Sequence, residues 1–231
     1  MNSIRQMIRE ELLKEAGDKC LAKFGEFLFG ENDVFYKGTV EKDTEFEAKL
    51  WDDVRKYVES GPKSVDIGKF AQALKGLQAC MGDYAHVLKP NSRTLMRGMN
   101  IEMSKMKRLL RNYKSDHLLG FLENEGKTLE KVHAEVFSMI DSSFKYKPMR
   151  EVESWTTDTK RAMEFSKAWE GSNNSIIVKA TFPKNDLLFN TKFTNTISWA
   201  EYEILRISNK TVTCELYIQP KTIKRILVDT V

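Results

Sequence analysis

The spacing of apolar residues changes along this 231-residue chain, and that change constrains the fold more than any other feature. Up to about residue 90, apolar side chains recur three and four positions apart, which is the period of an amphipathic helix. From Ser154 onward they fall into short runs rich in β-branched and aromatic residues, which is typical of strands. Helices followed by strands favour the α+β class over a doubly wound parallel sheet.

The same patterns place the individual elements. Helices are expected over Ser3–Ala16, around Phe46–Val58, and over Ile67–Leu88, Met103–Tyr113, Thr128–Ile140 and Thr159–Trp169. Strands are expected over Thr94–Met99, Ser175–Phe182, Asp186–Phe189, Glu203–Ile207, Thr211–Ile218 and Lys221–Val228. We therefore expect a helical N-terminal region, residues 1–90, packed on a core formed by residues 91–231.

Charge and hydropathy exclude several classes of protein. The 37 basic and 33 acidic residues give a net charge of +4, which does not favour a nucleic-acid partner unless the charge is gathered in one patch. No apolar run approaches the roughly 18 residues of a membrane span, and the charged N-terminus lacks the core of a signal peptide. Three cysteines at unrelated spacings indicate reduced thiols, so we expect a cytoplasmic protein with no membrane partner.

Metal binding is not expected either. The three histidines, His86, His117 and His133, lie far apart in the sequence, and no cysteine or carboxylate is spaced with them as in a metal-site motif.

Three short motifs follow one another at intervals of about 50 residues. Arg97-Gly98 closes the first expected strand, Ser154-Trp155-Thr156 leads into a helix, and Glu201-Tyr202-Glu203 leads into a strand. Side chains two apart on an extended chain point to the same face, so Glu201 and Glu203 present two carboxylates together. Each motif alone is most often a surface residue, a cap or a solvated edge, and only their combination points to a site.

In this order the motifs resemble those of the arginine, serine, glutamate class of mono-ADP-ribosyltransferases, which includes arginine-modifying toxins and enzymes of T-even-type bacteriophages. The resemblance covers approximately residues 91–231, and it implies two antiparallel-rich sheets around an NAD cleft. In that family the serine motif precedes a helix with a small residue and then an aromatic facing the core. Ala162 and Phe165 match this pattern, with Thr157 or Asp158 placed to cap the helix.

The resemblance gives the two carboxylates different roles. Glu203 would hydrogen-bond the nicotinamide ribose of NAD and stabilise the positive charge that develops there as nicotinamide leaves. Glu201 would hold an acceptor guanidinium and take its proton, and the two carboxylates should raise each other's pKa. A Glu at position 201 is associated in the family with arginine acceptors. Trp199, on the turn before this motif, would either recognise the protein substrate or pack beneath the turn.

The other motif residues would hold NAD, which serves as co-substrate with no metal. Arg97 would pair with the diphosphate through its planar guanidinium, and Gly98 would let the main chain approach the nicotinamide amide. Ser154 would orient Glu203, while Trp155 and Thr156 would shape the nicotinamide wall. For Trp155, packing in the core is an equally strong interpretation.

A basic helix face follows Arg97. Its residues are Lys105, Lys107, Arg108, Arg111 and Lys114. Solvation is the favoured interpretation of this face, and the alternatives are contact with the adenosine phosphate end of NAD or with an acidic protein substrate.

The sequence thus predicts a protein-arginine ADP-ribosyltransferase. By resemblance to the phage enzymes, its acceptor would be a host protein of transcription or translation, and it would act in the host cytoplasm or be carried in the virion. The alternatives are an NAD glycohydrolase, in which water replaces the acceptor, and a non-catalytic member that binds a partner or belongs to a virion.

Overall fold

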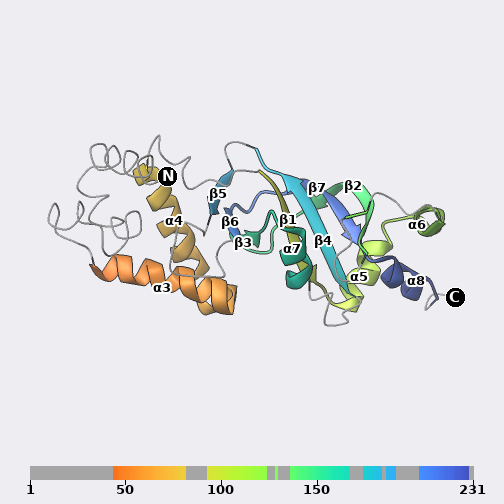
Figure 1. Ribbon diagram of the computed structural model, residues 1–231, viewed down its shortest axis with the longest axis horizontal. Helices are drawn as coiled ribbons and strands as arrows, with labels where there is room; N and C mark the ends of the chain where they lie inside the picture. Colours follow the sequence, from red (N-terminus) through yellow and green to blue (C-terminus); the bar gives the residue numbers. More distant parts are fainter. Residues whose placement is uncertain are drawn as a thin grey trace. The chain divides into compact units, whose positions relative to one another are not determined.

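The computed structural model describes residues 44–81, 93–123, 128–129, 136–166, 174–183, 186–190 and 203–228. The chain forms two compact units. Unit 1 consists of Met1–Asn91, Arg150–Glu153 and Leu187–Ser208, and unit 2 of Ser92–Met149, Ser154–Asp186 and Asn209–Val231. Two helices precede the first strand, further helices are interspersed with the strands, and the strand pairs β1–β4, β4–β7, β2–β7 and β5–β6 are antiparallel, which confirms the expected α+β class (Figure 1).

The described part of unit 1 contains two amphipathic helices. They are α3 (Thr44–Ser60) and α4 (Ile67–Met81), separated by the short 3-10 helix η1 (Pro62–Ser64). Their buried side chains recur at helix spacing: Leu50, Val54 and Tyr57 on α3, and Phe70, Leu74 and Leu77 on α4. Both helices confirm the periodicity of the sequence, whereas the helix expected over Ser3–Ala16 lies outside the described residues.

The end of α3 is fixed by a glycine. Gly61 has φ 78° and ψ −177°, a backbone region that is essentially limited to glycine. Its N–H donates to Tyr57 O at 2.9 Å, which satisfies a carbonyl of the last helical turn.

The sheet of unit 1 has the strand order β3-β6-β5. These strands are β3 (Val152–Trp155), β6 (Ile204–Ile207) and β5 (Leu187–Asn190), and the last two residues of β3 already belong to unit 2. Tyr57 Oη donates to Val152 O at 3.0 Å, and Lys75 on α4 pairs with Glu151. Both helices are therefore anchored to the start of β3.

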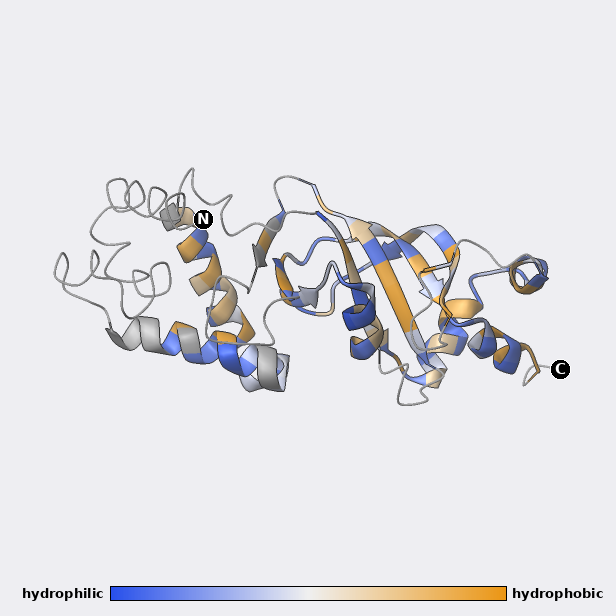
Figure 2. Ribbon diagram, viewed as in Figure 1, coloured by the Kyte–Doolittle hydropathy of each residue, from blue (hydrophilic) through white to orange (hydrophobic). Residues whose placement is uncertain are grey.

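Unit 2 is built on an antiparallel sheet with the order β1-β4-β7-β2. Its strands are β1 (Thr94–Asn100), β4 (Ser175–Thr181), β7 (Val212–Ile218) and β2 (Ser138–Tyr146). The central strand β4 is hydrophobic along most of its length, which matches its burial between two neighbours (Figure 2). Four of the expected strands, those over 94–99, 175–182, 203–207 and 211–218, are confirmed within one or two residues, and β5 confirms the fifth.

Four helices in the described part of unit 2 accompany this sheet. They are α5 (Met103–Leu110), α6 (Ser115–Glu123), α7 (Thr159–Phe165) and α8 (Pro220–Val228). Gly98, Ile177, Tyr217 and Met139 stand opposite one another on successive strands and so share one face of the sheet. The buried Ala162 and Met163 of α7 join the core cluster on this face.

Gly98 allows α7 to approach β1 closely. A Cβ at this position would lie 1.6 Å from Ala162 O and 2.8 Å from Ser166 N, both of them backbone atoms. No side chain fits there without displacing the helix.

Two of the expected elements are wrong. Ser138–Ile140 forms the start of β2 instead of the end of a helix, and Thr128 forms a β-bridge with Ser138. Lys221–Val228 is helical instead of extended, because its β-branched residues follow a helix period: Thr222, Ile223 and Ile226 are buried. The helix α6 and most of β2 were not expected at all.

The helix after the serine motif matches its prediction in part. Asp158 is the N-cap of α7, since its Oδ1 accepts a hydrogen bond from Arg161 N at 3.1 Å. Ala162 is fully buried as expected, but Phe165 is 41% exposed and does not face the core. Met163 takes the buried position instead.

The close approach at Gly98 predicts a large effect of one methyl group. Gly98→Ala should lower the free energy of unfolding by about 1–3 kcal/mol, because α7 must move away from β1. Gly120→Ala is the matched control, because Gly120 lies on α6 with no atom within 4 Å of its Cβ position. This variant should raise the free energy of unfolding by about 0.5–1 kcal/mol. Urea unfolding followed by circular dichroism measures both, and an unchanged Gly98→Ala protein would contradict this packing.

Candidate functional site

The structure brings the first two sequence motifs together in unit 2. Met96 N donates to Thr156 O at 2.7 Å, and Thr156 N donates to Met96 O at 2.8 Å. This antiparallel bridge sets β1 beside the end of β3. Arg97 and Ser154, 57 residues apart in sequence, become neighbours, and Arg97 Nη1 donates to Ser154 O at 2.5 Å.

Arg97 is therefore held in place by the backbone of the serine motif. Its side chain is half-buried in the middle of β1, which runs on to Asn100, so the expectation that Arg97-Gly98 closes this strand is wrong. A guanidinium carries five N–H donors in a planar fork, so it can bind a main-chain carbonyl and also a planar or tetrahedral anion. Partial removal from water strengthens such an ionic contact.

Gly98 has a structural role that the sequence did not reveal. Its missing Cβ is required by the backbone of α7, as described above. Its predicted contact with the nicotinamide amide remains a prediction.

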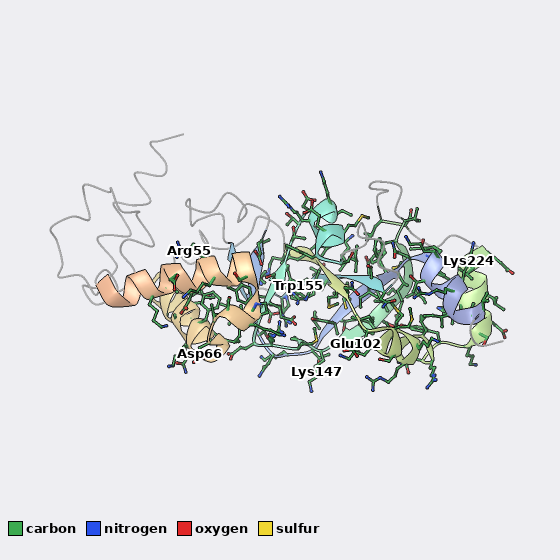
Figure 3. The ribbon with its side chains drawn as sticks, turned by 90° about the horizontal axis from the view of Figure 1, so that it is seen from below. Arg55, Asp66, Glu102, Lys147, Trp155 and Lys224 are labelled. Carbon is green, nitrogen blue, oxygen red and sulfur yellow. The ribbon has the colours of Figure 1, made fainter. Side chains whose placement is uncertain are left out.

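Trp155 lies in the interior of unit 2, and its position is labelled in Figure 3. The ring is fully buried and meets Tyr146 and Phe182 edge-on, with ring centroids 5.8 and 4.8 Å apart. These contacts agree with core packing, the alternative interpretation of this residue. Within the described part of the chain, the indole Nε1 is buried without a hydrogen-bond acceptor.

Thr156 connects the serine motif to α7. It is fully buried, and its Oγ1 accepts a hydrogen bond from Asp158 N at 3.0 Å. This turn presents Asp158 as the N-cap of the helix. A role for Thr156 in the nicotinamide wall remains a prediction.

Glu203 belongs to unit 1, where it immediately precedes β6. It is only 7% exposed. A carboxylate so buried needs a compensating partner or a function, because burial disfavours the charged form. Glu201 and Trp199 lie outside the described residues.

Unit 1 contains two further buried charged residues that the sequence patterns did not indicate. Glu153 and Arg206 are each 2% exposed, and Arg206 Nη2 donates to Ser208 Oγ at 3.3 Å. Glu153 directly precedes Ser154, and Arg206 interrupts the apolar strand β6 three residues after Glu203. For Arg206, a charged residue inside the otherwise apolar strand β6 was the signal that could have identified it.

Among the residues described, no three His, Cys, Asp or Glu side chains are grouped so that they could hold a metal ion. Within the same ranges, no helix combines the length and the hydropathy needed to cross a bilayer.

Comparison of the chain with protein-family models, with curated proteins and with solved structures gives no match.

The bond between Arg97 and Ser154 predicts a measurable contribution to stability. Arg97→Ala removes the charged donor that binds the Ser154 carbonyl, so it should lower the free energy of unfolding by about 1.5–3 kcal/mol. Arg108→Ala, at an exposed position on α5, is the control and should change the free energy of unfolding by less than about 0.5 kcal/mol. Equal urea midpoints for the two variants would show that this bond does not hold β3 to β1.

Proposed function

We propose that the protein is an NAD-dependent mono-ADP-ribosyltransferase that modifies arginine side chains of proteins. The observation that carries the proposal is the bond from Arg97 to Ser154 O, which makes neighbours of two motif residues 57 positions apart. In the resembling family these residues act at one NAD site.

The residues of unit 2 suit the phosphate end of NAD. Arg97 is cationic, half-buried and fixed by the main chain, which are the properties needed to bind a diphosphate in one orientation. Ser154 is half-buried beside it. Trp155 and Thr156 would act by supporting this arrangement from the core, since both are fully buried.

Glu203 would act on the ribose. NAD supplies the ADP-ribosyl group, and nicotinamide leaves with the electron pair of the glycosidic bond. Positive charge develops on the ribose as that bond breaks, and a nearby carboxylate stabilises it electrostatically. The low exposure of Glu203 strengthens this interaction, because a low-dielectric site screens charges less than water does.

Glu201 would act on the acceptor. A guanidinium is protonated at physiological pH and is not nucleophilic in that form. As the new carbon–nitrogen bond forms, the guanidino group loses a proton, and a carboxylate beside it can accept that proton. This role makes arginine the acceptor.

The proposal also covers the sheets of the core, the acceptor protein and the place where the protein acts. Each unit contains antiparallel strands, as each of the two sheets of a transferase core would. The acceptor would be a host protein of transcription or translation, modified in the cytoplasm of a phage-infected cell.

The proposal predicts different losses from the two carboxylates. Wild-type protein, incubated with NAD labelled in the adenosine moiety and a bacterial lysate, should transfer label to protein, and Glu203→Ala should lower both transfer and nicotinamide release by about 100-fold or more. Glu201→Gln should abolish transfer while nicotinamide release continues, because water then replaces the guanidine.

The controls separate this activity from its alternatives. Equal labelling by wild type and Glu203→Ala would overturn the proposal. Nicotinamide release by wild type without labelled protein would identify an NAD glycohydrolase instead. Lack of any NAD-dependent rise in melting temperature would indicate a non-catalytic binding protein.

A further inference from the structure

The positive charge of the chain is unevenly divided between the two units. Unit 2 carries 20 basic and 13 acidic residues, a net charge of +7, whereas unit 1 carries 17 and 20, a net charge of −3. The overall value of +4 therefore conceals a basic unit. Such asymmetry is typical of proteins that meet a polyanion.

Much of this charge gathers on α5. A groove on this helix is lined by Glu102, Ser104, Lys105, Lys107, Arg108 and Arg111. Glu102 is the only acid among them, and its carboxylate lies 3.6 Å from Lys105 Nζ at an exposed position. Its single negative charge is outnumbered by the four basic residues of the lining, so the groove is cationic.

The helix α8 extends the charged surface. Arg225 Nη2 contacts Met103 Sδ at 3.6 Å, so α8 lies against the start of α5, as Figure 1 shows. Its exposed Lys221 and Lys224 are three residues apart and share a face. Glu102 and Lys224, both labelled in Figure 3, mark the two helices. The α5–α8 basic surface consists of Lys105, Lys107, Arg108, Arg111, Lys221 and Lys224.

An aromatic pair comes directly after α5 in the chain. Tyr113, two residues after Arg111, stacks on His117 with ring centroids 5.6 Å apart and an interplanar angle of 18°. Tyr113 Oη donates to Asp141 Oδ2 at 2.8 Å, which fixes its ring, and His117 is exposed. A cationic groove beside a rigid, accessible aromatic face is the combination that binds unpaired bases on a phosphate chain.

We propose that the α5–α8 basic surface, with the Tyr113–His117 pair, binds single-stranded nucleic acid. The cations contact phosphates, and an unpaired base stacks on His117. An acidic protein would use the same charges but gains little from the stacked rings. This binding is a separate property of unit 2 and does not depend on the proposed transferase activity.

Fluorescence anisotropy with a labelled 20-residue oligothymidylate tests the surface on the full chain. The double variant Arg108→Glu/Arg111→Glu should weaken binding about tenfold or more at low salt, and should reduce the slope of log K against log salt by about 1.4, since each lost phosphate contact on a single strand contributes about 0.7. His117→Ala should weaken binding about fivefold through lost stacking.

The matched control is Lys63→Glu/Lys69→Glu, which makes the same charge change at exposed positions of unit 1. It should leave binding within about twofold of wild type, because those lysines contact no phosphate. Equal loss in both double variants, or no binding of the oligonucleotide at low salt, would overturn the proposal. So would equal or tighter binding of a 20-base-pair duplex, or equal competition by polyglutamate, which would assign the surface to an acidic protein.

Discussion

The pairing of Met96 with Thr156 is the constraint on which unit 2 depends. Two short main-chain hydrogen bonds, of 2.7 and 2.8 Å, join the outer strand of a four-stranded sheet to the segment that starts α7. This pairing sets the helix over Gly98, where only glycine leaves room for it. It also brings the carbonyl of Ser154 to the guanidinium of Arg97. Sheet, helix and candidate site therefore share one anchoring interaction.

Local sequence patterns predicted those elements whose tertiary contacts favour the same structure as their own residue propensities. The strands β1, β4 and β7 and the helices α3, α4 and α7 are examples, since their apolar periods are unambiguous. Tertiary contacts decided the others. The apolar residues of Thr128–Ile140 have a helix-like spacing, yet the last residues of this segment pair with β7. In α8 the β-branched residues lie on one buried face of the helix. Propensity is a weak guide where pairing and burial outweigh it.

The sequence likewise predicted some features of the candidate site, whereas others depend on the fold. The order of the motifs in the sequence indicates Arg97 and Ser154, and the structure makes them neighbours. The buried state of Trp155 and Glu153 depends on neighbours distant in sequence, which no single motif reveals. The basic face of α5 was expected to be merely solvated, because only the fold sets it beside α8 and an aromatic pair.

The central claim is that Arg97, held by the serine motif, binds the diphosphate of NAD. Calorimetric titration of NAD into Glu203→Ala, with and without Arg97→Lys, tests it without turnover. Lysine keeps the charge and a donor for Ser154 O but lacks the planar fork. Glu203→Ala should bind NAD, and adding Arg97→Lys should lower that affinity about tenfold or more, about 1.4 kcal/mol. Equal affinities, or no binding of NAD by either protein, would contradict it.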